Sequence, residues 1–200
     1  MFDLITDLVA ATGYLGIALL MFAENAFPPI PSELIMPLAG FEAAAGTLSL
    51  AGVIAAGTIG SLAGALLWYW IGRAVGTERL RRWSARHGRW LTLSPDEIDR
   101  ASDWFRRRGG WAVLVGRLVP GVRTLISVPA GVAEMPLAPF LAWTAIGTAA
   151  WTALLAGTGY LLRDGYAVVA GWLDPVSNAV VLFLVLAYLY RVATFRSERP

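Results

Sequence analysis

The segment VGRLVPGVRTLISVPAG, residues 115–131, places two arginines in an otherwise apolar run that two prolines interrupt. The arginines are Arg117 and Arg123, and the prolines are Pro120 and Pro129. A membrane-spanning helix avoids such charges because one charged side chain at the bilayer centre costs about 2.5–3.5 kcal/mol on insertion scales. The two arginines therefore indicate a function, and the rest of the chain has to define the environment in which they act.

The overall composition identifies that environment as a lipid bilayer. Hydrophobic residues make up 57% of the chain and charged residues 15%, and the mean hydropathy is +0.61. Residues 43–72 and 135–162 contain no charged side chain. Since about 20 apolar residues are enough for a helix to cross the hydrocarbon core, we predict an all-α polytopic membrane protein. Its transmembrane helices are expected at 46–73, 136–162 and 172–192.

The arginines indicate which side of the membrane each region faces. Ten of the 16 arginines lie between Arg73 and Arg108, and three more lie within residues 191–200. The positive-inside rule assigns both regions to the cytoplasm. Residues 74–110 are therefore predicted to be a cytoplasmic arginine-rich loop, and the C-terminus is predicted to be cytoplasmic. Because these charges are explained by topology, nucleic acid is not expected as a partner.

One amphipathic helix is predicted inside this loop. Ser94 is suited to the N-cap, Pro95 to the first helical position and Glu97 to the capping box. An apolar stripe follows, formed by Ile98, Ala101, Trp104 and Phe105. Gly109 and Gly110 are expected to end the helix. It lies either in solvent or on the anionic lipid surface, with tryptophans as anchors.

Two further segments, 14–45 and 111–134, are too interrupted to span the membrane as ordinary helices. Proline removes a backbone donor and clashes with the preceding turn, and broken backbone at membrane depth is tolerated only against protein or water. We therefore predict two re-entrant helix–break–helix hairpins that meet near the midplane, beside three to four full transmembrane helices. Surface loops are the alternative. The predicted breaks are Pro28, Pro29, Pro31, Pro120 and Gly121.

The two halves of the chain resemble each other. The stretch PLAG at 37–40 is similar to PAG at 129–131, and the pair IG occurs at 59–60 and at 146–147. Another glycine follows each IG pair after 12 residues. If the arginine-rich loop is cytoplasmic, the two uncharged helices run in opposite directions across the membrane. This combination predicts an inverted repeat, a common plan among transporters.

The charged residues beside the breaks are the candidate site. A guanidinium binds phosphate through two parallel hydrogen bonds and stays charged at any depth, so Arg117 and Arg123 are predicted to bind phosphate. Glu24 and Glu33 flank the proline-rich break. Burial disfavours their charged form and a neighbouring arginine favours it. When phosphate occupies the arginines, a carboxylate is expected to take up a proton, which predicts proton coupling.

The order and spacing of these residues closely resemble the DedA family of the SNARE-associated (VTT-domain) superfamily, over roughly residues 14–165. The matching positions are Glu24-Asn25, Pro28 to Glu33, Pro37 to Gly40, Tyr69 to Arg73, Gly76, Gly116-Arg117, Pro120 to Thr124, Ser127, Pro129 to Gly131 and Met135-Pro136. One departure is Ala65, where many members carry Asp.

The resemblance implies a bacterial inner-membrane protein with two opposed re-entrant hairpins that translocates lipid. Undecaprenyl phosphate or phosphatidylethanolamine is the implied cargo, and proton-motive force is a proposed drive. The family's membrane carboxylates correspond to Glu24 and Glu33, and its arginines to Arg117 and Arg123.

Two other classes of function stay open. A lipid phosphatase or intramembrane protease needs a nucleophile and a base, yet the chain has no cysteine and its one histidine, His87, lies in the arginine-rich loop. Gly60-Ser61 lacks the full spacing of a nucleophile elbow, although two carboxylates could perform acid–base chemistry. Alternatively, the charged residues only hold an assembly factor together. We predict no catalytic residue, metal or cofactor, and a homo-oligomer is left open.

Overall fold

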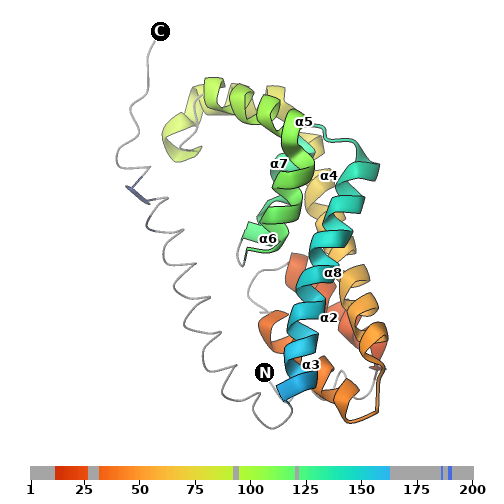
Figure 1. The fold of residues 1–200 in the computed structure, drawn as a ribbon. Coiled ribbons are helices and arrows are strands. Elements are labelled where there is room, and N and C mark those ends of the chain that lie inside the picture. Colours follow the sequence, from red (N-terminus) through yellow and green to blue (C-terminus); the bar gives the residue numbers. More distant parts are fainter. Residues whose placement is uncertain are drawn as a thin grey trace.

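A computed structural model of the 200-residue chain describes residues 12–26, 32–91, 95–119 and 122–162, together with 186 and 189–190. Within these ranges the regular structure is entirely helical (Figure 1). The elements are α2 (Tyr14–Ala26), α3 (Ser32–Ala44), α4 (Leu50–Leu91), α5 (Pro95–Arg117), α6 (Val122–Leu125), α7 (Ser127–Val132) and α8 (Leu137–Leu162).

Two of these helices, α4 and α8, are long and apolar enough to cross a membrane. The apolar spans are Leu50–Ser84 in α4 and Leu137–Leu161 in α8. They coincide with the transmembrane helices predicted at 46–73 and 136–162, because an uncharged run of this length favours a helix that buries its backbone hydrogen bonds. The helix predicted at 172–192 lies largely outside the described residues.

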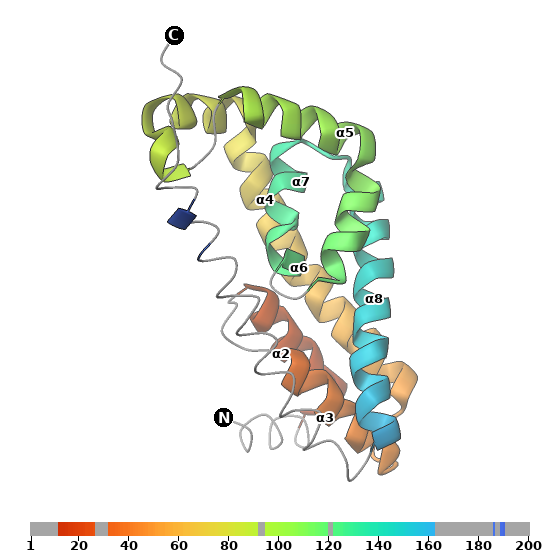
Figure 2. The same ribbon diagram turned by 60° about the vertical axis from the view of Figure 1, so that its left-hand side comes forward.

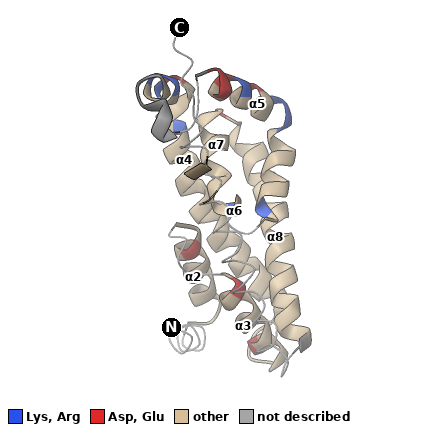
Figure 3. Cartoon of the chain, turned by 90° about the vertical axis from the view of Figure 1, so that its left-hand side faces the viewer, with Lys and Arg blue, Asp and Glu red and all other residues tan. Residues whose placement is uncertain are grey.

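The segment 74–110, predicted as a cytoplasmic arginine-rich loop with one amphipathic helix, is helical over most of its length, and its location in the cytoplasm stays a prediction. Helix α4 continues through Leu91. Gly76 interrupts its course with a positive φ of 66°, a conformation that glycine adopts without steric cost. The stretch that follows Gly76 has no proline and is rich in arginine, a good helix former. Nε of its Arg81 lies 3.5 Å from Asp99 Oδ2 in α5, and Figure 3 shows many charged residues along α5 at this end of the molecule.

Helix α5 begins at Pro95, where the sequence predicts a helix start, and its first part ends in a kink at Arg108, directly before the predicted stop at Gly109-Gly110. The backbone departs from helical angles at Arg108, with φ −129° and ψ 15°, and the helix then continues to Arg117. The glycines permit close packing here, because a Cβ on Gly110 would overlap the Trp143 ring of α8. The kink therefore joins the surface part of α5 to a second part that packs beside α8.

The short helices form two groups that approach the middle of the long helices from opposite ends (Figure 2). One group is α2 with α3, and the other is the end of α5 with α6 and α7. Helix α2 packs on α4 while α3 packs on α8, and in the other group α5 packs on α8 while α7 packs on α4. In each group, one helix therefore packs against α4 and the other packs against α8.

Glycines allow the closest of these contacts. A Cβ on Gly40 or Gly159 would overlap the facing backbone where α3 meets α8. A Cβ on Gly72 or Gly131 would overlap the facing backbone where α7 meets α4. Gly40 and Gly131 belong to the two similar stretches PLAG and PAG, so these stretches occupy equivalent positions in the two groups.

Two apolar clusters fill the spaces between the helices. One surrounds Met21, Ile35 and Leu155, and the other surrounds Tyr69 and Phe140. Tyr69 stacks on Phe140 with ring centroids 4.5 Å apart. Between Phe140 and Leu155, Gly147 of α8 packs against the Arg117 side chain and Trp151 lies beside Arg123, so this part of α8 borders the candidate site.

Candidate functional site

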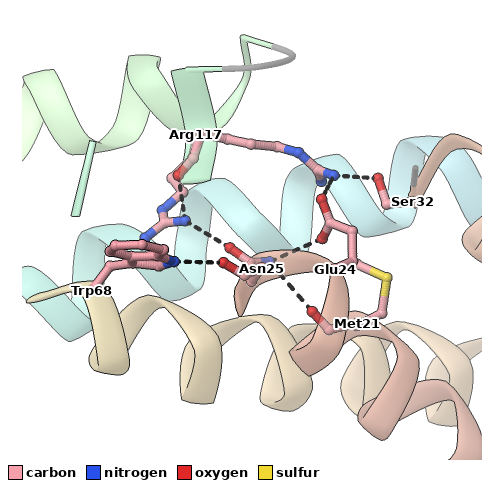
Figure 4. Close-up of polar contacts among 7 residues, drawn as sticks. Met21, Glu24, Asn25, Ser32, Trp68 and Arg117 are labelled. Atoms are coloured by element: carbon pink, nitrogen blue, oxygen red, sulfur yellow. Dashed lines mark hydrogen bonds and ion pairs between the residues drawn. The ribbon is translucent and has the colours of Figure 1, made fainter. Parts of the chain in front are cut away.

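Six buried polar side chains come together where the ends of α2, α3, α5, α6 and α7 meet, and Figure 4 shows Glu24, Asn25, Ser32 and Arg117 among them. The ends of α2 and α5 and the starts of α3 and α6 lie beside the predicted breaks, so the charged groups lie where helical backbone stops or begins. They are Glu24 and Asn25 in α2, Ser32 in α3, Arg117 in α5, Arg123 in α6 and Ser127 in α7.

Arg123 connects the two groups of short helices. Its Nη2 donates to a carboxylate oxygen of Glu24 in an ion pair, and also to Ser32 Oγ at 2.5 Å. Its guanidinium lies 5.8 Å from the centroid of the Trp151 ring in α8, within range of a cation–π interaction. Both members of the ion pair are buried, so loss of either one would leave an uncompensated charge away from water.

Arg117 is equally buried but contacts only neutral acceptors among the described residues. Its side chain is 2% exposed. Nη1 donates to the Arg123 carbonyl at 2.5 Å and to Asn25 Oδ1 at 3.4 Å, and Nη2 donates to Ser127 Oγ at 2.6 Å. Its Nε has no hydrogen-bond partner in the described part of the chain. This guanidinium therefore has an unused donor and no carboxylate in contact.

Asn25 bridges the carboxylate and Arg117 (Figure 4). Its Nδ2 donates to Glu24 Oε2 at 3.1 Å and to the Met21 carbonyl at 3.5 Å, while its Oδ1 accepts from Arg117. The main-chain carbonyl of Asn25 accepts from Trp68 Nε1 at 2.9 Å. The side-chain amide is thus held between an anion and a cation with one end toward each.

The structure brings three of the four predicted site residues, Glu24, Arg117 and Arg123, into one network. Glu33 is also buried and follows Ser32 in the first turn of α3. Its carboxylate forms no ion pair with the residues that the structure describes, whereas Glu24 pairs with Arg123. The five predicted break residues lie outside the described residues.

Sequence reasoning missed three members of the site: Asn25, Ser127 and Trp151. Asn25 and Ser127 stand within the quoted motifs. Because they are polar residues in apolar stretches, the sequence could have identified them as site residues. Nothing in the sequence distinguished Trp151 from the other tryptophans, because tryptophan is common in this chain. The hydroxyl of Ser32, the first residue of α3, accepts a hydrogen bond from Arg123.

The donor set of the site suits an oxyanion. Two guanidiniums, two hydroxyls and one amide converge, and guanidinium is a strong bidentate partner for phosphate. Over the described residues, no group of three or more His, Cys, Asp or Glu side chains is placed to hold a metal ion. His87 lies in α4, and its side chain is outside the described part.

Comparisons with known proteins agree with the resemblance seen in the sequence. "Alkaline phosphatase-like protein" of Lactococcus lactis subsp. cremoris (strain MG1363) is 41% identical over 198 residues, which cover 98% of this chain and 92% of the relative. "Undecaprenyl phosphate transporter A" of Staphylococcus aureus is 34% identical over 197 residues, which cover 98% of this chain and 97% of the relative. The protein of the same name from Bacillus subtilis is 32% identical, with 91% of this chain and 90% of the relative covered.

No solved structure matches the chain. Residues 30–161 match the VTT domain, a region that includes α3 to α7 and nearly all of α8. Arg117, Arg123, Ser32 and Ser127 fall within the matched region, while Glu24 and Asn25 precede it. From this match and from relatives that are similar over nearly their whole length, the chain belongs to the VTT domain family.

Proposed function

We propose that this chain is a membrane lipid translocase that moves a phosphate-headed lipid, undecaprenyl phosphate first, across the bacterial inner membrane. Two relatives bear the name undecaprenyl phosphate transporter A, and the buried arginines supply the chemistry for a phosphate group. The alternatives are a scramblase for phosphatidylethanolamine or another phospholipid, and an assembly factor that transports nothing.

The observation that carries this proposal is the environment of Arg117. A buried cation without an anion in contact is costly, and the described residues offer its guanidinium only neutral acceptors and leave its Nε unpartnered. A phosphate group would supply the missing charge and accept from the free donor. Arg123 lies one short connection away and would bind the same phosphate once Glu24 releases it.

The proposed membrane arrangement has α2–α3 and α5–α7 as two opposed re-entrant hairpins of an inverted repeat. The reciprocal packing of these helices on α4 and α8 supports it, as do the equivalent glycine contacts. With the arginine-rich end in the cytoplasm, the C-terminus is also cytoplasmic. The polar site then lies between two apolar clusters, near the middle of the long helices.

In the proposed mechanism, the lipid tail stays in the bilayer while the phosphate alone enters between the hairpins. Phosphate competes with Glu24 for Arg123, and the displaced carboxylate takes up a proton because a buried charge without a partner is unfavourable. Glu33 offers a second buried carboxylate beside Ser32. Phosphate and proton then cross as an assembly of lower net charge, which lowers the cost of passage.

The test is reconstitution of the full chain in liposomes with one lipid placed in a single leaflet. Undecaprenyl phosphate, phosphatidylethanolamine and uncharged undecaprenol are compared, and inorganic phosphate is measured in the same samples. We expect undecaprenyl phosphate to cross fastest and undecaprenol to cross at the protein-free rate, without phosphate release.

Each other result has a defined meaning. Equal rates with and without protein would refute transport and favour an assembly role. Release of inorganic phosphate would favour the phosphatase activity that the name of the Lactococcus relative denotes. Faster crossing of phosphatidylethanolamine would keep translocation and replace the cargo.

A further inference from the structure

We infer that Asn25 is a positioning residue whose side-chain amide couples protonation of Glu24 to the release of Arg117 for phosphate. This inference rests on the proposed function, since it explains how one site would bind proton and phosphate together. It starts from the hydrogen bonds drawn in Figure 4.

The present orientation of the amide fits an ionised Glu24. An asparagine side chain has a donor end and an acceptor end. Nδ2 faces two acceptors, Glu24 Oε2 at 3.1 Å and the Met21 carbonyl at 3.5 Å. Oδ1 faces a donor, Nη1 of Arg117, at 3.4 Å. Every contact of this amide therefore pairs a donor with an acceptor.

Protonation of Glu24 would reverse one of these contacts. Arg123 occupies Glu24 Oε1, so Oε2 is the oxygen that takes a proton from water. A protonated Oε2 is a donor, and it would then face Nδ2, which is also a donor. Rotation of the amide by half a turn restores the pairing at Glu24, because Oδ1 then accepts from the carboxylic acid, and it gives up only the long 3.5 Å bond from Nδ2 to the Met21 carbonyl.

The same rotation changes what Arg117 meets. Nδ2 would then point at Nη1, and two donors cannot bond to each other. Arg117 loses one of its neutral acceptors and gains a second unused donor beside Nε, while Arg123 loses its counter-charge. Both guanidiniums are then available to a phosphate. No covalent bond other than the carboxylic O–H forms or breaks.

The surroundings permit this change at the side chain alone. The Asn25 carbonyl is held by Trp68, so the main chain stays in place while the amide turns. The charged groups near Glu24 are Arg123 from α6, Arg117 from α5 and Glu33 from α3. Helix α8 and the part of α4 packed on α2 carry no charged residue, so no other carboxylate on those helices competes for the proton.

The first experiment observes the amide directly in the unaltered chain. Asparagine occurs at two positions in the sequence, 25 and 178, so protein labelled with ¹⁵N-asparagine gives two side-chain amide signals by NMR in detergent. Asn178→Gln assigns them, because the signal that remains belongs to Asn25. We expect the Asn25 amide signals to shift as the pH falls from about 8 to about 5, and to stay constant in Glu24→Gln.

The second experiment measures binding of farnesyl phosphate, a soluble prenyl phosphate, at each pH. Coupling between two sites commonly changes affinity by about 5- to 150-fold. We expect the acid-to-neutral affinity ratio of the wild type to fall by at least about fivefold in Asn25→Leu and in Asn25→Ala. The ligand's own titration cancels because variants are compared at equal pH. The matched control is Thr47→Ala, which removes a neutral donor from the Glu42 carboxylate at an exposed position away from the site and should keep the wild-type ratio.

Defined results would overturn the inference. An Asn25 amide signal that ignores pH in the wild type, or that shifts equally in Glu24→Gln, would exclude the rotation even if no Asn25 variant folds. A wild-type affinity ratio in the folded Asn25 variants would exclude it as well. Neither measurement requires transport, so loss of lipid flux with both results as expected would refute the proposed function and leave the coupling intact.

Discussion

Replacing Arg117 by lysine separates the shape of the guanidinium from its charge. In the structure this side chain distributes donors from two nitrogens over three acceptors. A lysine ammonium keeps the charge but is a compact point charge, so it would bind one phosphate oxygen where arginine binds two. A hydrogen bond to a charged group contributes about 1.5–3 kcal/mol. Loss of one bond should weaken phosphate binding by about 10- to 100-fold.

The assay is undecaprenyl phosphate transport in liposomes at limiting lipid concentration, with Arg117→Lys beside the wild type. The matched control is Arg106→Lys, the same change at a half-exposed residue of α5 that pairs with Asp103 at the surface. We expect a loss of about 10- to 100-fold for Arg117→Lys and wild-type flux for the control. Normal flux in Arg117→Lys would show that charge alone suffices, and an equal loss in both variants would show that the effect is not specific to the site.

Three further predictions follow from the fold and the site. Because the chain has no native cysteine, a cysteine at position 86 should react with an impermeant reagent only from the cytoplasm. One at position 168, outside the described residues, should react only from the opposite side, and the reverse would refute the inverted repeat. Glu24→Gln should keep passive exchange of lipid between leaflets but lose accumulation against a gradient under an imposed pH difference, whereas unchanged accumulation would favour a passive scramblase. Gly159→Ala should lower the thermal stability of the purified protein by about 1–3 kcal/mol, because the new Cβ meets the Pro37 backbone. In contrast, Gly157→Ala has open space and should stabilise the helix by up to about 1 kcal/mol, so equal effects would contradict the packing argument.

The positions of the two long helices were predictable from the sequence. Absence of charge over a length sufficient to cross a bilayer is a local property, and a helix is the only way for a single segment to satisfy its own backbone there. The start of α5 at Pro95 was predictable for a similar reason, since its capping signals lie within four residues. Arg117, Arg123 and Glu24 could be selected as site residues because charge is rare in apolar segments.

The pairing of these residues was decided only by the tertiary structure. Glu24 and Arg123 are 99 residues apart in the chain, and nothing local to either one specifies that Arg123 takes the carboxylate while Arg117 takes neutral acceptors. The glycine pair Gly109-Gly110 also shows that local sequence signals do not determine packing. A glycine pair signals a helix end when the chain is considered alone, and the first part of α5 does end in a kink beside it, but only the packing of α8 against the glycines decides that a second helical part follows. Local signals depend on the backbone of one segment, whereas the partners of a buried side chain depend on which other helices surround it.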